Sequence, residues 1–195
     1  QKEQKKLSDQ IIKDRRYLHQ HPELSYKEKN TTAYLVASLK ELGIPVQTFE
    51  DYTGCIATIK GGKPGKHTVL LRGDIDALPI KEKQRCRILK VRMRGVMHAC
   101  GHDCHTSIVI RSSKILSAHR DEIHGTVKLI FQMAEEIGRK SEEYVKEGAL
   151  EGVDAIFGMH IWSAVPAGKV NFESGERMAC SDRFTIKIHG KSSHG

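Results

Sequence analysis

The residues best suited to chemistry in this chain lie in one short segment, residues 98–105. The segment reads His-Ala-Cys-Gly-His-Asp-Cys-His and holds three imidazoles, two thiols and one carboxylate. An adjacent acid pair, Glu135 and Glu136, and a further histidine, His160, follow along the chain. Imidazole, thiolate and carboxylate are the ligands of zinc-like divalent ions, and an acid beside a ligand acid is a common general base. The sequence therefore predicts a metal-dependent hydrolase.

The spacing of these residues favours one shared metal site. Cys100 and His102 flank Gly101, so both side chains can reach one ion from the same side. A glutamate and His160, each at the end of another predicted strand, would complete the coordination shell. Because thiolate and carboxylate occur together, Zn, Mn, Co or Ni is favoured over Mg or Ca. Two alternatives for Cys100 are a small buried hydrophobic residue and, less favoured, the nucleophile of a Cys–His hydrolase.

The acidic residues are expected to divide the remaining roles. If Glu135 and Glu136 continue a strand, their side chains point in opposite directions, so one binds metal and the other faces the water that is activated. The alternative for this pair is a solvated acidic loop. Asp76, which follows an earlier predicted strand, is expected to orient a ligand imidazole from behind. A loop-capping role is the alternative for Asp76.

The other histidine and cysteine side chains near these motifs are assigned supporting roles. Cys104 falls at a predicted helix start and is expected to be a packed thiol, with a third soft ligand as the alternative. His98 and His105 are expected to support the ligands. His19 and His21 are expected to be surface or helix-capping residues.

Hydrophobic periodicity predicts alternating helices and strands. Helices are expected at 8–20 with Ser8 as N-cap, from a capping box at Ser25–Glu28 to Gly43, from Asp103 onward, and near 141–148, and strands at 44–49, 54–60, 67–72, 126–132 and 154–159. The run from Thr68 to Leu71 is apolar without alternation, as expected of a strand covered on both faces. Since the polar clusters follow strand ends, the chain is expected to be an α/β domain with its site at that edge of the sheet.

Composition narrows the class of protein. A chain of 195 residues with 38% hydrophobic and 29% charged residues suits one to one and a half globular domains, and no apolar run is long enough to span a membrane. Residues 81–94 account for +6 of the net charge of +8, so a basic surface loop is expected rather than a nucleic-acid site. The five cysteines, odd in number and without secreted-domain spacing, and the absence of a signal segment favour a cytoplasmic location.

Six segments together resemble the metal-dependent amidohydrolases that include N-acyl-amino-acid amidohydrolases, hippurate hydrolases and auxin-conjugate hydrolases. In order they are 16–25, 73–79, 96–106, 134–136, 148–160 and 190–195, so they span nearly the whole chain. The resemblance implies an α/β catalytic domain over residues 1–180, with a mixed central sheet flanked by helices and a site for two divalent metal ions. It also implies that residues 181–195 begin an α+β lid domain through which such enzymes form homodimers. The alternating apolar residues of 184–188 predict the first strand of this domain.

The resemblance also implies a role for each candidate residue. Four residues become metal ligands: Cys100, His102, Glu136 and His160. Glu135 becomes the general base and proton shuttle, and His194 matches a lid-domain histidine that reaches the partner subunit's site to steady the oxyanion. The expected substrate is an N-acyl amino acid or small peptide. The alternatives are a carboxypeptidase or dipeptidase on the same scaffold, an inactive fragment that only binds metal or a partner, and, more weakly, a nucleic-acid binder that uses residues 81–94.

The chain departs from the family pattern in four respects. Residues 81–94 are basic where relatives carry an acidic loop with Gly and Pro. Met133 stands where Pro is usual, and Ile137 where a small residue is common. Relatives run to twice this length, so their last ligand histidine and most of the lid would lie beyond Gly195.

Overall fold

The computed structural model describes residues 2–83, 91–138, 140–179, 182 and 184–194. The chain forms two compact units, Gln1–Ile161 and Trp162–Gly195. All helices and strands of the described residues belong to the first unit. In chain order they are α1 (Lys2–Gln20), α2 (Lys29–Glu41), β1 (Val46–Gln47), β2 (Cys55–Lys60), β3 (Lys63–Asp74), α3 (His102–Ala118), the 3-10 turn η2 (Arg120–Glu122), β4 (His124–Gln132), the 3-10 turn η3 (Glu135–Ile137), α4 (Ser141–Lys146) and β5 (Ala155–Gly158).

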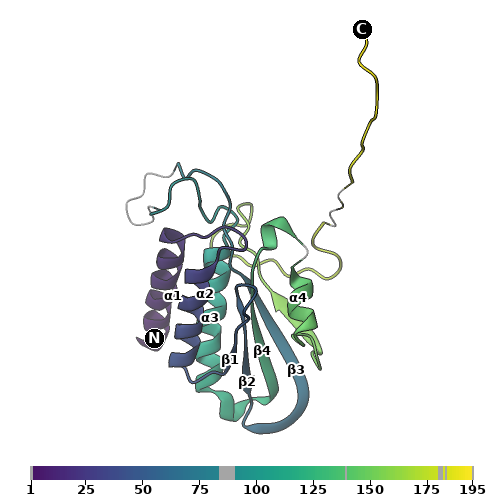
Figure 1. Cartoon of the computed structure of the whole chain (residues 1–195). Coiled ribbons are helices and arrows are strands. Elements are labelled where there is room, and N and C mark those ends of the chain that lie inside the picture. Colours follow the sequence, from purple (N-terminus) through teal and green to yellow (C-terminus); the bar gives the residue numbers. More distant parts are fainter. Residues whose placement is uncertain (1, 84–90, 139, 180–181, 183, 195) are drawn as a thin grey trace. The chain divides into compact units, whose positions relative to one another are not determined.

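The five strands form one mixed sheet in the order β1-β2-β4-β3-β5 (Figure 1). β1 and β2 are antiparallel, as are β2 and β4, whereas β4, β3 and β5 are parallel to one another. Asp74 of β3 lies opposite Gln132 of β4, and Arg72 lies opposite Gly158 of β5. The carboxyl ends of three adjacent strands therefore meet at one edge, and the predicted α/β class with a mixed sheet is confirmed.

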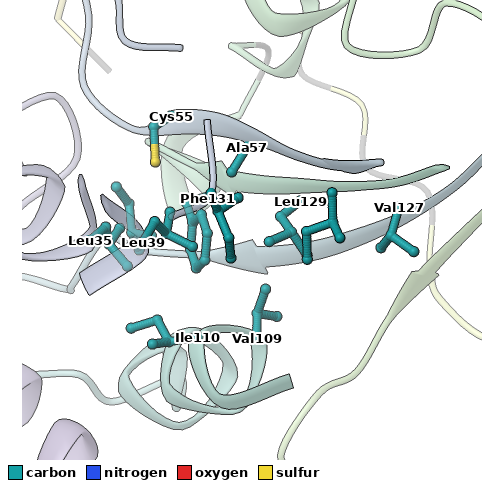
Figure 2. Packing of buried hydrophobic residues seen from close by; sticks show 12 residues of the cluster. Leu35, Leu39, Cys55, Ala57, Val109, Ile110, Val127, Leu129 and Phe131 are labelled. Carbon is teal, nitrogen blue, oxygen red and sulfur yellow. The ribbon is translucent and has the colours of Figure 1, made fainter. Parts of the chain in front are cut away.

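One face of the sheet packs against α2 and α3, with α1 on the same side (Figure 1). Every second residue of β2 and β4 faces these helices, as the alternation of side chains along a strand requires. The buried cluster contains Leu35, Leu39, Ile44, Cys55, Ala57, Ile59, Ile75, Val109, Ile110, Val127, Leu129 and Phe131 (Figure 2). Burying each large side chain of this kind stabilises the fold by about 1.5–3 kcal/mol.

The opposite face carries a second, smaller core around Tyr144 of α4. Ile56 and Ile130 pack against it from β2 and β4, and Leu70 packs from β3. Leu71, the next residue of β3, packs against the helix side instead. Both faces of β3 are thus covered, which is why its sequence lacks alternation, as predicted.

The N-terminus of α2 differs from the predicted capping box. The side chains of Ser25 and Glu28 both bond elsewhere, and Glu28 makes no side-chain cap bond. The cap is Glu23, whose carboxylate accepts the backbone N–H groups of Asn30 (3.1 Å) and Thr31 (2.8 Å). A negative charge at a helix N-terminus also suits the helix dipole. Glu23 lies further upstream of the helix than the residues of a capping box do. Its carboxylate still reaches the helix start because the chain from Glu23 to Glu28 folds back on itself.

Two further expectations about elements were wrong. Ser8 does not cap a helix, because α1 already includes it from Lys2 onward, and the residues before Ser8 are good helix formers with no breaker. The strand expected at residues 184–188 is absent: the described residues of the second unit form neither helix nor strand. The side chains of Phe184, Ile186 and Ile188 are exposed there. Alternating apolar residues are not enough to form a strand, since a strand is stable only when it pairs with a neighbour.

Other expectations fall partly outside the described residues. Residues 84–90 of the basic segment 81–94 are among those not described. The predicted domain boundary between residues 180 and 181 stays a prediction. Within the part of the chain that the structure describes, no helix is long and apolar enough to cross a membrane.

Candidate metal centre

The loops that follow three parallel strands, together with the start of α3, supply the candidate site. Asp76 follows β3, the pair Glu135–Glu136 follows β4, and His160 follows β5. Cys100 lies just before α3, and His102 is the first residue of that helix. Gly101 between them has a φ of 91°, a left-handed conformation that favours glycine and that turns the chain into the helix. All four predicted metal ligands therefore come from one edge of the sheet.

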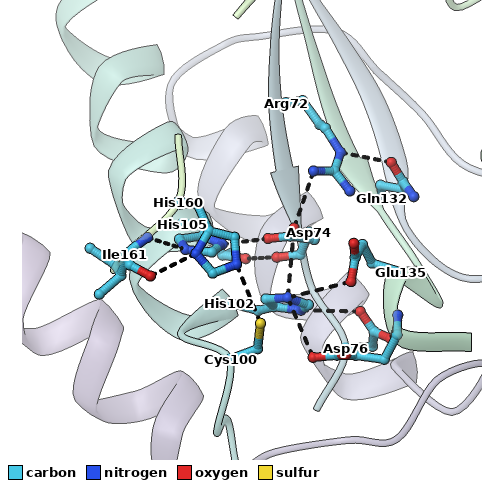
Figure 3. Close-up of polar contacts among 12 residues, drawn as sticks. Arg72, Asp74, Asp76, Cys100, His102, His105, Gln132, Glu135, His160 and Ile161 are labelled. Atoms are coloured by element: carbon cyan, nitrogen blue, oxygen red, sulfur yellow. Dashed lines mark hydrogen bonds and ion pairs between the residues drawn. The ribbon is translucent and has the colours of Figure 1, made fainter. Parts of the chain in front are cut away.

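His102 lies at the centre of the group (Figure 3). Its Nε2 atom is 3.7 Å from Glu136 Oε1, 3.8 Å from Glu135 Oε2 and 3.7 Å from Asp74 Oδ2. One ligand atom each from Cys100, His102 and His160 also lie within 4.8 Å of one another. The structure thus brings together the four predicted ligands and the predicted base.

Two atoms of this group are buried without a hydrogen-bond partner among the described residues: His102 Nε2 and Glu136 Oε1. Their separation of 3.7 Å is too long for a hydrogen bond. A buried polar atom left unsatisfied costs about 1–3 kcal/mol. Two ligand atoms that share a zinc-like ion at about 2.0–2.2 Å each would lie at a comparable separation. The orphaned atoms and the thiolate, imidazole and carboxylate donors therefore fit a divalent cation.

The thiol of Cys100 adds to the electrostatic argument. Its Sγ atom is 3.3 Å from His160 Nε2. Burial, followed by the neighbouring Glu136 carboxylate, raises the pKa of Cys100 to about 12. Only a nearby cation would make this thiol a thiolate near neutral pH. The carboxylates around Cys100 also disfavour a negative charge on its sulfur unless a cation is bound.

Asp76 ties several parts of the site together. Its Oδ1 atom is 3.2 Å from His102 Nδ1, while Oδ2 accepts the Ser25 hydroxyl at 2.6 Å and the Glu136 backbone N–H at 3.1 Å. Burial opposes ionisation of Asp76, but these hydrogen bonds outweigh it and lower its pKa. An ionised Asp76 accepts a hydrogen bond from Nδ1–H of His102, which leaves the lone pair on Nε2 free. This is the tautomer that a metal ligand needs.

Asp74 is a residue of the site that sequence reasoning did not assign. It ends β3 two positions before Asp76, and its Oδ1 atom bonds His105 Nδ1 at 2.7 Å. His105 Nε2 in turn accepts the Ile161 backbone N–H at 2.9 Å. Burial opposes ionisation, yet the bond from His105 and the nearby His102 outweigh it and lower the pKa of Asp74 to about 2. The available signal was the Asp-x-Asp spacing, which places both carboxylates on one side of an extended chain.

The glutamate pair is placed differently from the expectation. β4 ends at Gln132, and Glu135 and Glu136 form the 3-10 turn η3 rather than a continued strand. Both carboxylates therefore approach His102 instead of pointing apart. Glu135 is the more accessible of the two, with a side-chain exposure of 38% against 17% for Glu136.

A second polar cluster lies behind the first turn of α3. His19 Nδ1 is 2.8 Å from Asp103 Oδ2, and His19 Nε2 is 2.9 Å from Glu82 Oε1. Arg15 donates to the same Asp103 oxygen at 2.9 Å. His19 is 3% exposed, so its assignment as a surface or capping residue was wrong. No local pattern predicts this burial, because the hydrogen-bond partners of His19 are more than 60 residues away along the chain.

The remaining candidates take these positions. Cys104 lies in the first turn of α3, partly buried, and His98 is buried with no hydrogen-bond partner for either ring nitrogen among the described residues. His194 lies in the second unit, exposed, and its catalytic role stays a prediction.

A mixed α/β sheet with imidazole, thiol and paired carboxylates at its carboxyl edge is the architecture of a metallohydrolase. The family model described as "Peptidase family M20/M25/M40" matches residues 70–193 of the chain. The chain therefore belongs to the peptidase family M20/M25/M40.

Individual relatives agree with this assignment. The chain is 42% identical over 194 residues to thermostable carboxypeptidase 1 of Saccharolobus solfataricus, covering 98% of this chain and 49% of the relative. It is 40% identical over 196 residues to an N-acyl-L-amino acid amidohydrolase of Geobacillus stearothermophilus, covering 98% and 52%. A Bacillus subtilis structure, described as a dinuclear metal binding peptidase from the M20 family, matches with a TM-score of 0.79 at 42% identity over 84% of this chain and 45% of that chain. The chain spans about half the length of the relatives it matches.

Proposed function

We propose that this chain carries the metal site and general base of a hydrolase that cleaves the amide bond of N-acyl amino acids. The observation that carries the proposal is the convergence of Cys100, Glu136 and His160 on His102, with His102 Nε2 and Glu136 Oε1 buried and without a hydrogen-bond partner among the described residues. Identity of 40% to an N-acyl-L-amino acid amidohydrolase supports the substrate class.

In this proposal Cys100, His102, Glu136 and His160 hold two divalent ions, of Zn, Mn, Co or Ni. When bound, such ions polarise the scissile carbonyl and lower the pKa of water at the site. The chain's own residues position these ions and transfer the proton. Asp76 holds the Nδ1–H of His102 and so fixes the direction of Nε2.

Glu135 takes the role of general base. Its carboxylate oxygen accepts a proton from the attacking water and then delivers that proton to the nitrogen of the leaving amine. Its partial exposure, against the more buried Glu136, leaves it open to water and substrate. His194, in the second unit, is assigned to steady the oxyanion from the partner subunit of a homodimer. A cytoplasmic location is part of the same proposal.

Metal analysis tests the ligand assignment. Cys100→Ser and His160→Ala are expected to lower the bound Mn²⁺ or Zn²⁺ per chain, measured after dialysis, whereas Cys55→Ser removes a buried thiol outside the site and should leave it unchanged. Unchanged metal content in both ligand variants would refute the assignment. Glu135→Gln should keep metal but lose about 10²–10⁴-fold in turnover, because the amide cannot take up the proton.

The placement of His194 needs a separate test in the whole protein. His194→Ala and Glu135→Gln are each expected to be inactive alone, but a mixed dimer would contain one site with both residues intact. Recovery of activity after subunit exchange supports a role in the partner's site, and no recovery despite demonstrated exchange overturns it.

A second substrate class has its own support. The identity of 42% to a thermostable carboxypeptidase favours hydrolysis of a peptide bond on the same scaffold. A panel of N-acetyl and N-benzoyl amino acids, compared with dipeptides and N-blocked dipeptides in kcat/KM, decides between the two classes.

A further inference from the structure

The turn that presents Glu135 and Glu136 begins with a residue in an unfavourable conformation. Ala134 precedes η3 with φ 52° and ψ 39°, in the left-handed region. For a residue with a Cβ this conformation costs about 1–2 kcal/mol. Ala134 is also 1% exposed, so it cannot relax toward solvent. Some other group must therefore hold the turn, or the two carboxylates would lose their direction toward His102.

The group that contacts this residue is the carboxylate of Glu28. Glu28 Oε1 accepts the Ala134 backbone N–H at 2.9 Å, and Glu28 Oε2 accepts the Thr53 hydroxyl at 2.6 Å. The two bonded residues, Glu28 and Ala134, are 106 positions apart. Glu28 has an exposure of 0%. The carboxylate thus links the segment before α2 to the end of β4.

Neither helix capping nor ion pairing accounts for this carboxylate. Glu28 does not cap α2, since Glu23 does so. No Lys or Arg of the described residues forms an ion pair with Glu28 within 4.0 Å, and burial raises its pKa. A buried carboxylate without a cationic partner is costly, and an apolar side chain would suit stability better. The hydrogen bonds from the Thr53 hydroxyl and the Ala134 N–H are therefore the contacts that account for an acid at this position, and the second of them acts on the turn that presents Glu135 and Glu136.

We propose that Glu28 is a positioning residue, which holds Ala134 in its left-handed conformation and thereby aims Glu135 and Glu136 at His102. The consequence for catalysis rests on the proposed function. The structural part does not, because it concerns only how the turn from Ala134 to Ile137 is held.

The chemistry of the contact predicts which substitutions are tolerated. Glutamine keeps one oxygen that can accept the Ala134 N–H. Its amide group can donate to the Thr53 hydroxyl, which then donates to Met133 Sδ, 3.6 Å away. Methionine has a similar length but no acceptor of comparable strength. Glu28→Gln should therefore rescue what Glu28→Met loses, an outcome that mere space-filling would not produce.

The experiment compares Glu28→Met, Glu28→Gln and the control Glu23→Met. Glu23 is also a largely buried acid before α2, but its carboxylate caps the helix and does not contact Ala134. In the 195-residue chain without added metal, amide hydrogen exchange is measured for Ala134 to Ile137. Glu28→Met should speed exchange there about tenfold or more relative to the rest of β4, while Glu28→Gln and Glu23→Met should change it less than about threefold.

A functional readout follows with Co²⁺ as the probe metal and N-acetyl amino acids as substrates. Glu28→Met should weaken Co²⁺ binding and lower kcat by about 10²-fold with KM changed less than threefold, since misplacement by about 1 Å has effects of this size. Glu28→Gln should stay within about fivefold of the unsubstituted protein in both. If Glu28→Met does not fold, Thr53→Val removes the hydroxyl that donates to Glu28 and should give an intermediate rise in exchange at Ala134.

The outcomes separate the two proposals. Unchanged exchange at Ala134 to Ile137 in Glu28→Met, or in Thr53→Val where that variant replaces it, overturns the positioning role whether or not metal binds. Equal loss in Glu28→Gln and Glu28→Met overturns it as well. If the unsubstituted protein neither binds Co²⁺ nor hydrolyses any substrate, the proposed function fails, and the exchange data still decide the role of Glu28.

Discussion

The Tyr144 hydroxyl lies in the core beneath the site and should be worth a measurable share of the stability. It accepts the Met133 backbone N–H at 3.0 Å and donates to the Thr53 carbonyl at 2.8 Å. Gly54 permits this approach, because a Cβ there would collide with the same hydroxyl. Tyr144→Phe would leave the buried Met133 N–H without a partner, and the Thr53 carbonyl with one fewer.

The expected loss follows from these two bonds. An unsatisfied buried backbone group costs about 1–3 kcal/mol, and the partly accessible Thr53 carbonyl can regain water, so the free energy of unfolding should fall by about 2 kcal/mol. In a chain of this size that corresponds to a fall in Tm of about 4–8 °C. Tyr52, in the same aromatic cluster, is the matched control. Its hydroxyl is buried with no hydrogen-bond partner among the described residues.

Urea denaturation of both single variants provides the assay. Tyr52→Phe removes an unsatisfied hydroxyl and should leave stability unchanged or raise it by up to about 1 kcal/mol. The reasoning is refuted if Tyr144→Phe costs no more than Tyr52→Phe, because ring packing is retained in both and only the hydrogen bonds differ. Equal slopes in urea are required for the comparison, since a changed slope would indicate a different unfolded state.

Three further outcomes are expected. The hydrogen bond to Asp103 raises the pKa of His19 despite burial, so the protonated imidazole stabilises the fold. This contribution is complete below the ordinary pKa of 6.5 and is lost as pH rises through the higher pKa of the folded state. Urea titrations between pH 5 and 9 should therefore show a free energy of unfolding that falls with pH, and His19→Gln should remove this dependence. Glu23→Ala should lower the free energy of unfolding by about 0.5–2 kcal/mol through loss of the α2 cap, measured by thermal melts, and an unchanged Tm would contradict that role. Added Zn²⁺ at about 100 times its Kd should stabilise the chain by about 2.7 kcal/mol, an effect that EDTA reverses and that should be missing in His102→Ala.

The order of elements and the location of the metal-binding groups could be predicted from the sequence. Apolar runs such as Thr68 to Leu71 determine a covered strand, because such a run can be buried on both faces. The clustering of ligand-type residues after predicted strands indicated the site, since parallel strands end at one edge. These are local properties: they depend on residue type and on spacing along a few turns or strand residues.

The tertiary structure alone decided which polar groups meet. Ser25 and Glu28 fit the capping pattern, yet their side chains bond Asp76, Thr53 and Ala134 instead. Asp74 became part of the site only through contacts with distant histidines. Neither the left-handed Ala134 nor the buried His19 has a signature in nearby residues. A buried donor or acceptor must be satisfied by whatever the packed chain brings next to it, and that partner is commonly 50 or more residues away, beyond the reach of any local pattern.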